Sequence, residues 1–387
     1  MVARKKRSKN TVEIAGVCDD RFTKLRRAFA ANFDDGDVGA AICVYRDGRP
    51  IVDLWGGLAD AKKNVPWSRD TLCATFSISK AFVSTMGHML IDRGELDLEA
   101  PVAHYWPAFA KHGKDGIKVK HLFEHRSALV NVDRDLKPGE LYDWPLMTKA
   151  LADSRPNWPY GRTPTYHSMT YGYLLGEVIR RIDGRRIGRF HREEIARPLG
   201  IDFAFALTPA EQRRCARVQP QTPPDEYMPP LPPNPAAAAR AIQGVAKGDR
   251  FNAPAFRAAE LGSGSGHGSA RGIAKFFACL GNGGSLDGVR LVSKRMRDYA
   301  IKFRAESIDP VFGVHNKFAL GLQLNNPPGM PMGPNPRSFG HLGAGGRIGF
   351  ADPDRGLAFA YVPNVMWYGG GLGPRGTRLI QTLFDCL

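Results

Sequence analysis

Ser77 and Lys80 lie three residues apart at the start of an apolar, periodic stretch at residues 81–93. If that stretch is a helix, the spacing places the hydroxyl and the amine on one face, one turn apart. A serine hydroxyl is a weak nucleophile until a base removes its proton, and a neighbouring amine with a lowered pKa can help to do so. A helix N-terminus adds free backbone N–H groups and a positive dipole end. The pair therefore indicates covalent catalysis through Ser77.

The pattern Ser-x-x-Lys is short, and a chain of this length is expected to contain roughly one by chance. A surface lysine beside a helix cap would give the same pattern. Two features favour the catalytic interpretation. The pattern occurs once in the chain, and it follows the apolar Phe76 directly at the start of a predicted helix.

A second pattern with chemical meaning is His121-x-x-Glu124-His125, a signature of certain zinc peptidases in which two histidines bind metal and the glutamate handles a proton. The run continues as Arg126-Ser127-Ala128-Leu129 and not as a long helix, which disfavours zinc but leaves a metallopeptidase as an alternative. The G-x-S-x-G motif of α/β-hydrolases is absent. The G-x-G-x-x-G at 371–376 lies too near the C-terminus for a nucleotide-binding βαβ unit.

Elements at both ends of the chain must position the Ser77 helix. Helical periodicity is present at 20–32, and the segments 38–45 and 51–55 flank Arg46-Asp47-Gly48, a turn sequence that predicts a β-hairpin. Near the other end we expect three further strands and a closing helix, at 338–341, 347–351, 357–362 and 375–384.

The middle of the chain, about 70–296, is mainly helical, with periodic stretches at 81–93, 171–182 and 270–280. Strands at both ends with helices between them predict one antiparallel sheet built from both chain ends, flanked by helices, with an inserted helical lobe. The fold class is therefore α+β.

Three regions follow from this pattern. Residues 1–12 form a basic, flexible tail, residues 13–75 and 270–387 form a sheet domain, and residues 76–269 form a mainly helical domain that carries the Ser77 helix at the interface. Two proline-rich segments, 220–235 and 325–336, are too rich in proline for a helix or a central strand. Long ordered loops of this kind often border sites, although a solvated linker fits equally well.

The chain of 387 residues has 54 Lys and Arg against 38 Asp and Glu, a formal net charge of +16. Such an excess can attract nucleic acid, anionic lipid headgroups or acidic substrates. Outside the tail the basic residues form short clusters on predicted helices, with no nucleic-acid module around them. We therefore expect solvated helix faces, no nucleic-acid partner, and at most a weak association with anionic surfaces.

Six cysteines are scattered without a C-x-x-C pair, which predicts free thiols and argues against a structural zinc site. No run approaches the ~18 apolar residues of a membrane span. The basic start of the chain lacks the apolar stretch of a secretory signal, so we expect a cytoplasmic protein.

Four further stretches follow Ser77-Ile78-Ser79-Lys80 in a fixed order: residues 122–129, Tyr166-His167-Ser168 before a helix with Tyr171-Gly172, Gly266-His267-Gly268, and Gly340-His341-Leu342-Gly343. The set resembles the motifs of serine β-lactamases and penicillin-binding proteins, and is most similar to class VIII carboxylesterases and related class C β-lactamase-like hydrolases. The resemblance covers nearly everything from residue 20 to 387. It implies the α/β sandwich of the β-lactamase and transpeptidase type and an acyl-enzyme on Ser77, with no metal or organic cofactor.

The resemblance also implies roles for single residues. Tyr166 matches the tyrosine that completes the catalytic group, and we expect the charge of Lys80 to lower its pKa so that it acts as general base and then acid. The third motif places glycines on an edge strand that a substrate can approach, and the N–H groups of Ala344 and Ser77 would form an oxyanion hole. A glycine-rich turn would explain Gly343 equally well.

Departures from the family pattern bear on the substrate. The K-T-G lysine of lactamases helps to hold a substrate carboxylate, whereas His341 is mostly neutral near pH 7 and the Leu342 side chain cannot donate a hydrogen bond. Ser168 stands where the second motif usually ends in asparagine. We expect neutral esters to be favoured over carboxylate-bearing β-lactams, with Ser168, His341, Gly343 and His125 as further candidates for substrate binding. An apolar acyl pocket is expected from residues of the loops, with the candidates Met228, Met330, Met332, Trp367 and Tyr368.

These features predict a serine carboxylesterase that cleaves short-chain esters, with weak β-lactamase activity as an accompanying hypothesis. Its partner is a small-molecule ester, and the residues make no prediction of oligomeric state. A β-lactamase, a D-amino-acid peptidase or an acyltransferase on the same scaffold is the main alternative. A zinc metallopeptidase built on His121, Glu124 and His125, or a non-catalytic binding protein, is the second.

Overall fold

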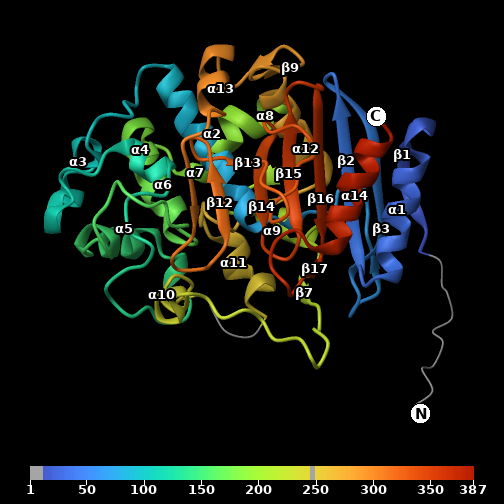
Figure 1. Cartoon of the computed structure of the whole chain (residues 1–387), viewed down its shortest axis with the longest axis horizontal. Coiled ribbons are helices and arrows are strands. Elements are labelled where there is room, and N and C mark those ends of the chain that lie inside the picture. The colour runs from blue at the N-terminus through green and yellow to red at the C-terminus, as the bar shows by residue number, and fades with distance from the viewer. Residues whose placement is uncertain (1–11, 245–248) are drawn as a thin grey trace.

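One large antiparallel sheet runs through residues 12–244 and 249–387, the part of the chain that this computed structural model describes (Figure 1). The strands follow the order β1 (Ile14–Cys18), β3 (Arg49–Asp60), β2 (Gly39–Arg46), β16 (Leu357–Pro363), β15 (Arg347–Asp352), β14 (Phe339–Gly343), β13 (Gln323–Leu324), β12 (His315–Phe318) and β11 (Ala305–Ile308). The short β4 (Val65–Pro66) pairs with β3. The antiparallel pairing of β2 with β16 joins the two chain ends, which confirms the predicted sheet.

The two central strands are buried on both faces, so their apolar residues alternate between two cores. Ile42 and Phe359 face a core that includes side chains of α1 (Thr23–Asp34) and α14 (Gly373–Asp385), which lie side by side (Figure 1). Cys43 and Ala360 face the main core, on the side of α12 (Ala270–Gly281). The result is a sheet held between two helical layers.

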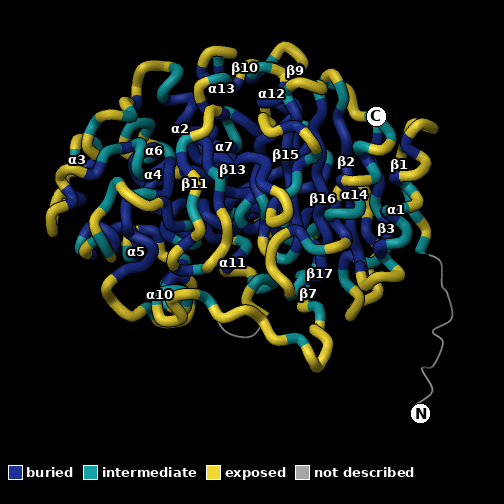
Figure 2. The backbone as a smooth tube through the Cα atoms, viewed as in Figure 1, coloured by how far each residue is buried: buried dark blue, intermediate teal, exposed yellow. Residues whose placement is uncertain are grey.

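The helix that follows Ser77, α2 (Ser79–Asp92), is the centre of the helical lobe, because every residue from Ser79 to Leu90 is buried. It packs against α6 (Thr170–Asp183). Figure 2 shows the same distribution, with buried backbone inside the lobe and the sheet and exposed backbone on the outer loops. The other helices are short: α3 (Val102–Tyr105), α4 (Val119–Phe123), α5 (Trp144–Asp153), α7 (Ile187–His191), α8 (Arg197–Leu199), α9 (Pro209–Arg213), α10 (Pro235–Arg240), α11 (Pro254–Ala258) and α13 (Lys294–Ala300).

Several short strands were not expected from the sequence. β5 (Cys73–Ala74) pairs with β8 (His267–Gly268), which also pairs with β6 (Phe203–Ala204), so the segment before Ser77 is tied to the Gly266-His267-Gly268 motif. Two smaller pairs are β7 (Gln219–Pro220) with β17 (Val365–Met366), and β9 (Ser285–Leu286) with β10 (Val289–Arg290). The expected division into a sheet domain and a helical domain remains a prediction, and the basic tail lies almost wholly outside the described residues.

The prediction that the Gly340–Gly343 strand lies at the sheet edge is wrong, because β13, β12 and β11 continue the sheet beyond β14. However, β13 pairs only with Phe339 and Gly340. On that side, His341 to Gly343 have no strand partner among the described residues, so the strand pairing stops before the half of β14 nearest Ser77.

In the described ranges no helix combines the length and the apolar character needed to cross a membrane. All six cysteines are free thiols, as expected, and three of them, Cys43, Cys73 and Cys279, are buried.

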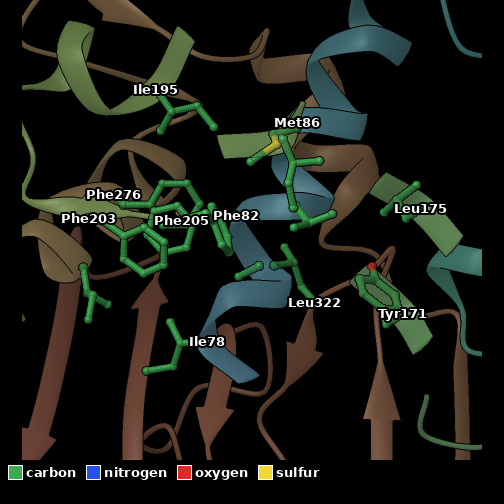
Figure 3. Packing of buried hydrophobic residues seen from close by; sticks show 14 of the residues in the cluster. Ile78, Phe82, Met86, Tyr171, Leu175, Ile195, Phe203, Phe205, Phe276 and Leu322 are labelled. Carbon is green, nitrogen blue, oxygen red and sulfur yellow. The ribbon is translucent and has the colours of Figure 1, made fainter. Parts of the chain in front are cut away.

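Aromatic stacking fixes α2 in the lobe. The ring of Phe82 lies between Phe203 and Phe276, with centroid separations of 3.7 Å and 3.9 Å (Figure 3). Phe82 is fully buried, so truncating it would leave a cavity directly beneath the helix that carries Lys80. The position of Lys80 therefore depends on this stack.

We predict that Phe82→Ala lowers the free energy of unfolding by about 3–5 kcal/mol, because the lost ring leaves a cavity. Urea unfolding measured by intrinsic fluorescence gives the value. Phe303→Ala is the matched control, since Phe303 is 55% exposed, and it should change stability by less than about 0.5 kcal/mol. Equal effects of the two substitutions would contradict the role given to the stack.

Candidate active site

Ser77 sits in a short 3-10 turn, Phe76–Ile78, between β5 and α2. Phe76, the residue before it, has a φ of +47°, in the left-handed region that a bulky residue rarely adopts. Such a conformation costs ~1–3 kcal/mol and persists only where the surroundings hold it. The Phe76 ring is held against Phe251 at a centroid separation of 4.8 Å, nearly perpendicular, and near Phe256. The strained residue thus turns the chain so that Ser77 opens the helix.

The Lys80 amine meets three oxygens. Its Nζ lies 3.0 Å from Ser77 Oγ, 2.8 Å from the Ser168 carbonyl oxygen and 2.9 Å from the Ser263 carbonyl oxygen. Lys80 is fully buried, and none of these partners is a carboxylate. Burial therefore lowers the pKa of the Lys80 amine well below its usual value, which favours the neutral amine.

Tyr166 reaches the same point from the segment before α6. Its backbone N–H donates to Asp309 Oδ2 at 2.6 Å, and its phenol is within hydrogen-bonding reach of the Ser77 hydroxyl. The Lys80 Nζ lies 4.7 Å from the centre of the ring. The structure therefore brings together Ser77, Lys80 and Tyr166, from segments about 90 residues apart in the chain.

The expected lowering of the Tyr166 pKa is not found. Burial raises the pKa of the phenol above its usual value, and the hydrogen bond with Ser77 offsets only part of that effect. Because burial also drives Lys80 toward its neutral form, the lysine charge that was expected to stabilise a phenolate is itself disfavoured. Burial therefore favours the uncharged form of both the amine and the phenol.

His125, a candidate for substrate binding, lies behind Tyr166 and not on a cavity wall. It is buried, with its ring centroid 5.1 Å from that of Tyr166 and 4.7 Å from that of Tyr171. Its Nδ1 accepts a hydrogen bond from the His167 backbone N–H at 3.1 Å. Burial lowers the pKa of the imidazole well below its usual value, so His125 is a neutral packing surface that supports the tyrosine.

The glycine of the third motif lets β14 approach the nucleophile. A Cβ on Gly343 would lie 2.3 Å from the Thr75 carbonyl oxygen, closer than atoms can approach, so only glycine fits between β14 and the segment that leads into Ser77. Ala344, the next residue, lines the same cavity as Ser77. The oxyanion hole expected from the backbone N–H groups of Ser77 and Ala344 remains a prediction, and both residues lie at this cavity.

The His341 side chain is buried and uncharged. Its Nδ1–H donates to the Leu342 carbonyl at 2.7 Å, and burial lowers the pKa of the imidazole to about 3. The Leu342 N–H is taken by the Gln323 side-chain oxygen at 3.0 Å. This part of β14 thus offers no cation to a substrate carboxylate.

A cavity of about 470 Å³ opens over Ser77. The reactive end is formed by Ser77, Ser168, Ser263 and Ala344, and most of the remaining wall is apolar, with contributions from Phe76, Met169, Val218, Pro220, Ile242, Phe251, Gly264 and Met366. Asp249, Arg250 and Asn252 add polar side chains to the same wall. Larger hollows of about 670 Å³ and 780 Å³ lie elsewhere on the molecule and include none of the residues at the reactive end. The cavity over Ser77 joins a mostly apolar wall to the reactive group.

The acyl-pocket residues expected from the sequence lie elsewhere. Met330 and Met332 are buried in the core beside α1 and α14, and Met228 is 84% exposed. Trp367 and Tyr368 stack on each other outside the cavity lining, where Met366 takes their place. The wall residues Ile242 and Phe251 were missed because they flank irregular chain, where no periodicity marks a side chain that points inward.

The zinc alternative lacks a converging set of ligands. His121 Nδ1 accepts a hydrogen bond from the Lys118 N–H, and Glu124 forms an ion pair with Arg126 at 3.3 Å. His125 faces Tyr166, and α4 ends before Glu124. Across the two described ranges, no group of three or more His, Cys, Asp or Glu side chains is placed to hold a metal ion.

Comparison with known proteins adds to this geometry. A family model described as Beta-lactamase matches residues 25–374. The esterase/beta-lactamase LipL of Mycobacterium tuberculosis is 34% identical over 377 residues, which cover 91% of this chain and 83% of LipL. A family VIII carboxylesterase of known crystal structure has a TM-score of 0.90 and 36% identity, covering 97% of this chain and 100% of that one. A penicillin-binding protein homolog from Caulobacter crescentus has a TM-score of 0.88 at the same identity and coverage.

We predict that Gly343→Ala slows labelling of Ser77 by a fluorophosphonate probe about 100-fold, since a displacement of about 1 Å at the reacting atoms has an effect of that size. The labelled peptide is identified by mass spectrometry. Gly329→Ala is the control, because a Cβ at Gly329 meets nothing closer than 3.8 Å, and its labelling rate should be unchanged. Normal labelling of Gly343→Ala would mean that β14 does not shape the site.

Proposed function

Because the chain belongs to the beta-lactamase family, we propose that it is a serine carboxylesterase that hydrolyses neutral, short-chain esters through an acyl-enzyme on Ser77. The observation that carries the proposal is the convergence of a buried amine and a half-buried phenol on one serine hydroxyl at the end of a mostly apolar cavity. Each of the three groups has a distinct task in moving one proton.

Lys80 is the base that activates Ser77. A neutral amine has two N–H donors and one lone pair. The carbonyl oxygens of Ser168 and Ser263 can only accept, so they take two N–H groups of Lys80. The third position of the amine faces Ser77 Oγ, to which Nζ donates in the structure, and in the neutral amine this position is the lone pair that receives the Ser77 proton. The two carbonyl groups therefore both bind the Lys80 amine and orient it toward Ser77.

Tyr166 then delivers the proton to the leaving group. When Ser77 Oγ attacks the ester carbonyl, its proton passes to Lys80 and the carbonyl oxygen becomes an oxyanion, which the N–H groups of Ser77 and Ala344 stabilise. As the tetrahedral intermediate collapses, the C–O bond to the alcohol breaks and the phenol protonates the departing oxygen, while Lys80 returns its proton to the phenol. Water repeats the sequence against the acyl-enzyme and releases the acid.

The cavity supports an ester as the substrate. Its wall is mostly apolar, and on β14 the uncharged His341 stands in place of the lysine that helps to hold a β-lactam carboxylate, so that Arg250 is the cationic side chain in the cavity lining. The family VIII carboxylesterase, similar along its whole length, points to the same chemistry. The combined name of LipL favours weak β-lactamase activity as a second candidate, and peptidase or acyltransferase activity would use the same acyl-enzyme with a different nucleophile.

We predict that Ser77→Ala lowers hydrolysis of p-nitrophenyl butyrate at least about 10⁴-fold without a change in melting temperature. Ser285→Ala, which changes a hydroxyl on β9 far along the chain, is the control and should leave turnover unchanged. Retained turnover in Ser77→Ala would reject the serine mechanism. A cephalosporin hydrolysed as fast as the ester would favour the lactamase candidate instead.

We further predict that Tyr166→Phe slows hydrolysis of ethyl butyrate by about 10²–10⁴-fold but that of p-nitrophenyl butyrate by less than about tenfold. The reason is that ethoxide needs a proton to leave, whereas p-nitrophenoxide leaves as a stable anion. Steady-state kcat on the two esters gives the ratio. Equal losses on both substrates would show that Tyr166 activates Ser77 and does not serve the leaving group.

A further inference from the structure

Arg347, the first residue of β15, lies behind the reactive serine and takes no part in the proton transfers described above. Its side chain is fully buried. Its Nη1 donates to the Ala344 carbonyl at 2.6 Å, and its guanidinium carbon lies 4.8 Å from the centre of the Phe76 ring. Among the described residues its Nε and Nη2 find no oxygen or nitrogen partner, although the guanidinium lies close enough to the Cys73 thiol to act on its pKa.

The positive charge of this arginine is not balanced by a neighbouring anion. Within the described ranges no carboxylate forms an ion pair with Arg347. Arg347 does influence the ionisation of one carboxylate, Asp37. That carboxylate is already paired with Arg375 at 3.2 Å and accepts a hydrogen bond from the Tyr361 hydroxyl. Burial raises the pKa of Asp37 to about 6 and that of the Cys73 thiol, another neighbour, above its usual value. A buried cation without a paired carboxylate destabilises a fold, because it loses its hydration and gains no equivalent interaction in exchange.

The two contacts of Arg347 are made with two separate segments, through the residue before Ser77 and the residue after Gly343. Phe76 precedes Ser77 and has the left-handed backbone that turns the chain into α2. Ala344 follows Gly343 and begins a turn in which Gly345 and Gly346 both have positive φ. The turn packs so closely on the guanidinium that a Cβ at Gly345 would lie 2.6 Å from Nη1. One planar cation therefore contacts both segments that supply the oxyanion donors.

We propose that Arg347 is a positioning residue for the oxyanion hole: it fixes the Phe76–Ser77 and Ala344 segments together and places an unbalanced positive charge behind the two donors. This inference rests on the proposed esterase function. The unbalanced charge has its use when the tetrahedral intermediate forms, because negative charge then appears in an enclosed, poorly screened site. The ground state of a neutral ester gains little from it.

The test compares Arg347→Met with a matched variant, Arg297→Met. Arg297 is also a buried arginine that donates to backbone carbonyls, those of Leu280 and Gly281, but it contacts neither Phe76 nor Ala344, and it is paired with Asp298 at 2.8 Å. On p-nitrophenyl butyrate we expect Arg347→Met to lower kcat about 100-fold and to change KM less than threefold, which is the loss typical of one oxyanion donor. Arg297→Met should keep kcat within twofold.

Two further measurements separate positioning from a general structural role. The affinity for a trifluoromethyl ketone, which forms an oxyanion on Ser77, should fall in Arg347→Met by about the same factor as kcat. The melting temperature should stay the same or rise, because an apolar residue replaces an unpaired buried charge. A purely structural arginine would instead give a lower melting temperature with an unchanged inhibitor constant and kcat per folded enzyme.

Conservative variants keep the proposal open to rejection if Arg347→Met does not fold. Arg347→Lys retains the positive charge, whereas Arg347→Gln retains only a hydrogen-bond donor. We therefore expect a higher kcat in Arg347→Lys than in Arg347→Gln, with each kcat calculated from the concentration of fluorophosphonate-reactive sites. Equal kcat values in these two variants, or a near-normal kcat in Arg347→Met, would overturn the inference. If Ser77→Ala is inactive and Arg347→Met is fully active, the role of Arg347 is rejected and the esterase function stands. If Ser77→Ala is active, the esterase function itself is rejected.

Discussion

The burial of the Lys80 amine is the constraint on which the site depends. In water an amine of this kind would be charged and could not accept a proton from a serine. Here it is enclosed by α2, α6 and the Ser263 segment, with two carbonyl oxygens as fixed partners and no carboxylate to hold the charge. The fold must therefore keep water and anions away from one atom while leaving the adjacent Ser77 hydroxyl open to a cavity. The interior position of α2, buried from Ser79 to Leu90, meets the first condition.

The second condition, a Ser77 hydroxyl that is open to the cavity, depends on Gly343 and on the strained residue Phe76 before α2. Phe76 adopts a positive φ just before the serine, and Gly343 allows β14 to contact Thr75. A regular strand-to-helix connection would leave Ser77 inside the protein, as the rest of α2 is. The energy needed for the strained turn is supplied by the packing around it, including the Phe251 ring and the Arg347 guanidinium.

The sequence predicts those parts of the molecule that depend on local chemistry. The hairpin around Asp47-Gly48, the strands of residues 347–351 and 357–362, and the placement of Ser77 and Lys80 on one helical turn follow from periodicity and turn residues, and the structure has them. The strands β11 to β13 were missed because they are short and mix polar with apolar residues, for example His315-Asn316-Lys317-Phe318. The residues of the cavity wall were missed for another reason. Met332 is in the core and Met366 lines the cavity because of how distant segments pack, and the two methionines cannot be told apart by residue type.

Charge, more than shape, distinguishes this site in its resting state. Lys80, Tyr166, His125 and His341 are all driven by burial toward their neutral forms, although in water the lysine would carry a charge and the histidines would titrate near pH 6.5. In their neutral forms, these four groups near the nucleophile neither attract nor repel an uncharged ester. Once the serine attacks, the same enclosure magnifies each interaction with the new negative charge, since poorly screened donors and cations act strongly over short distances. A site of this type discriminates between the substrate and the transition state through the charge that appears during the reaction.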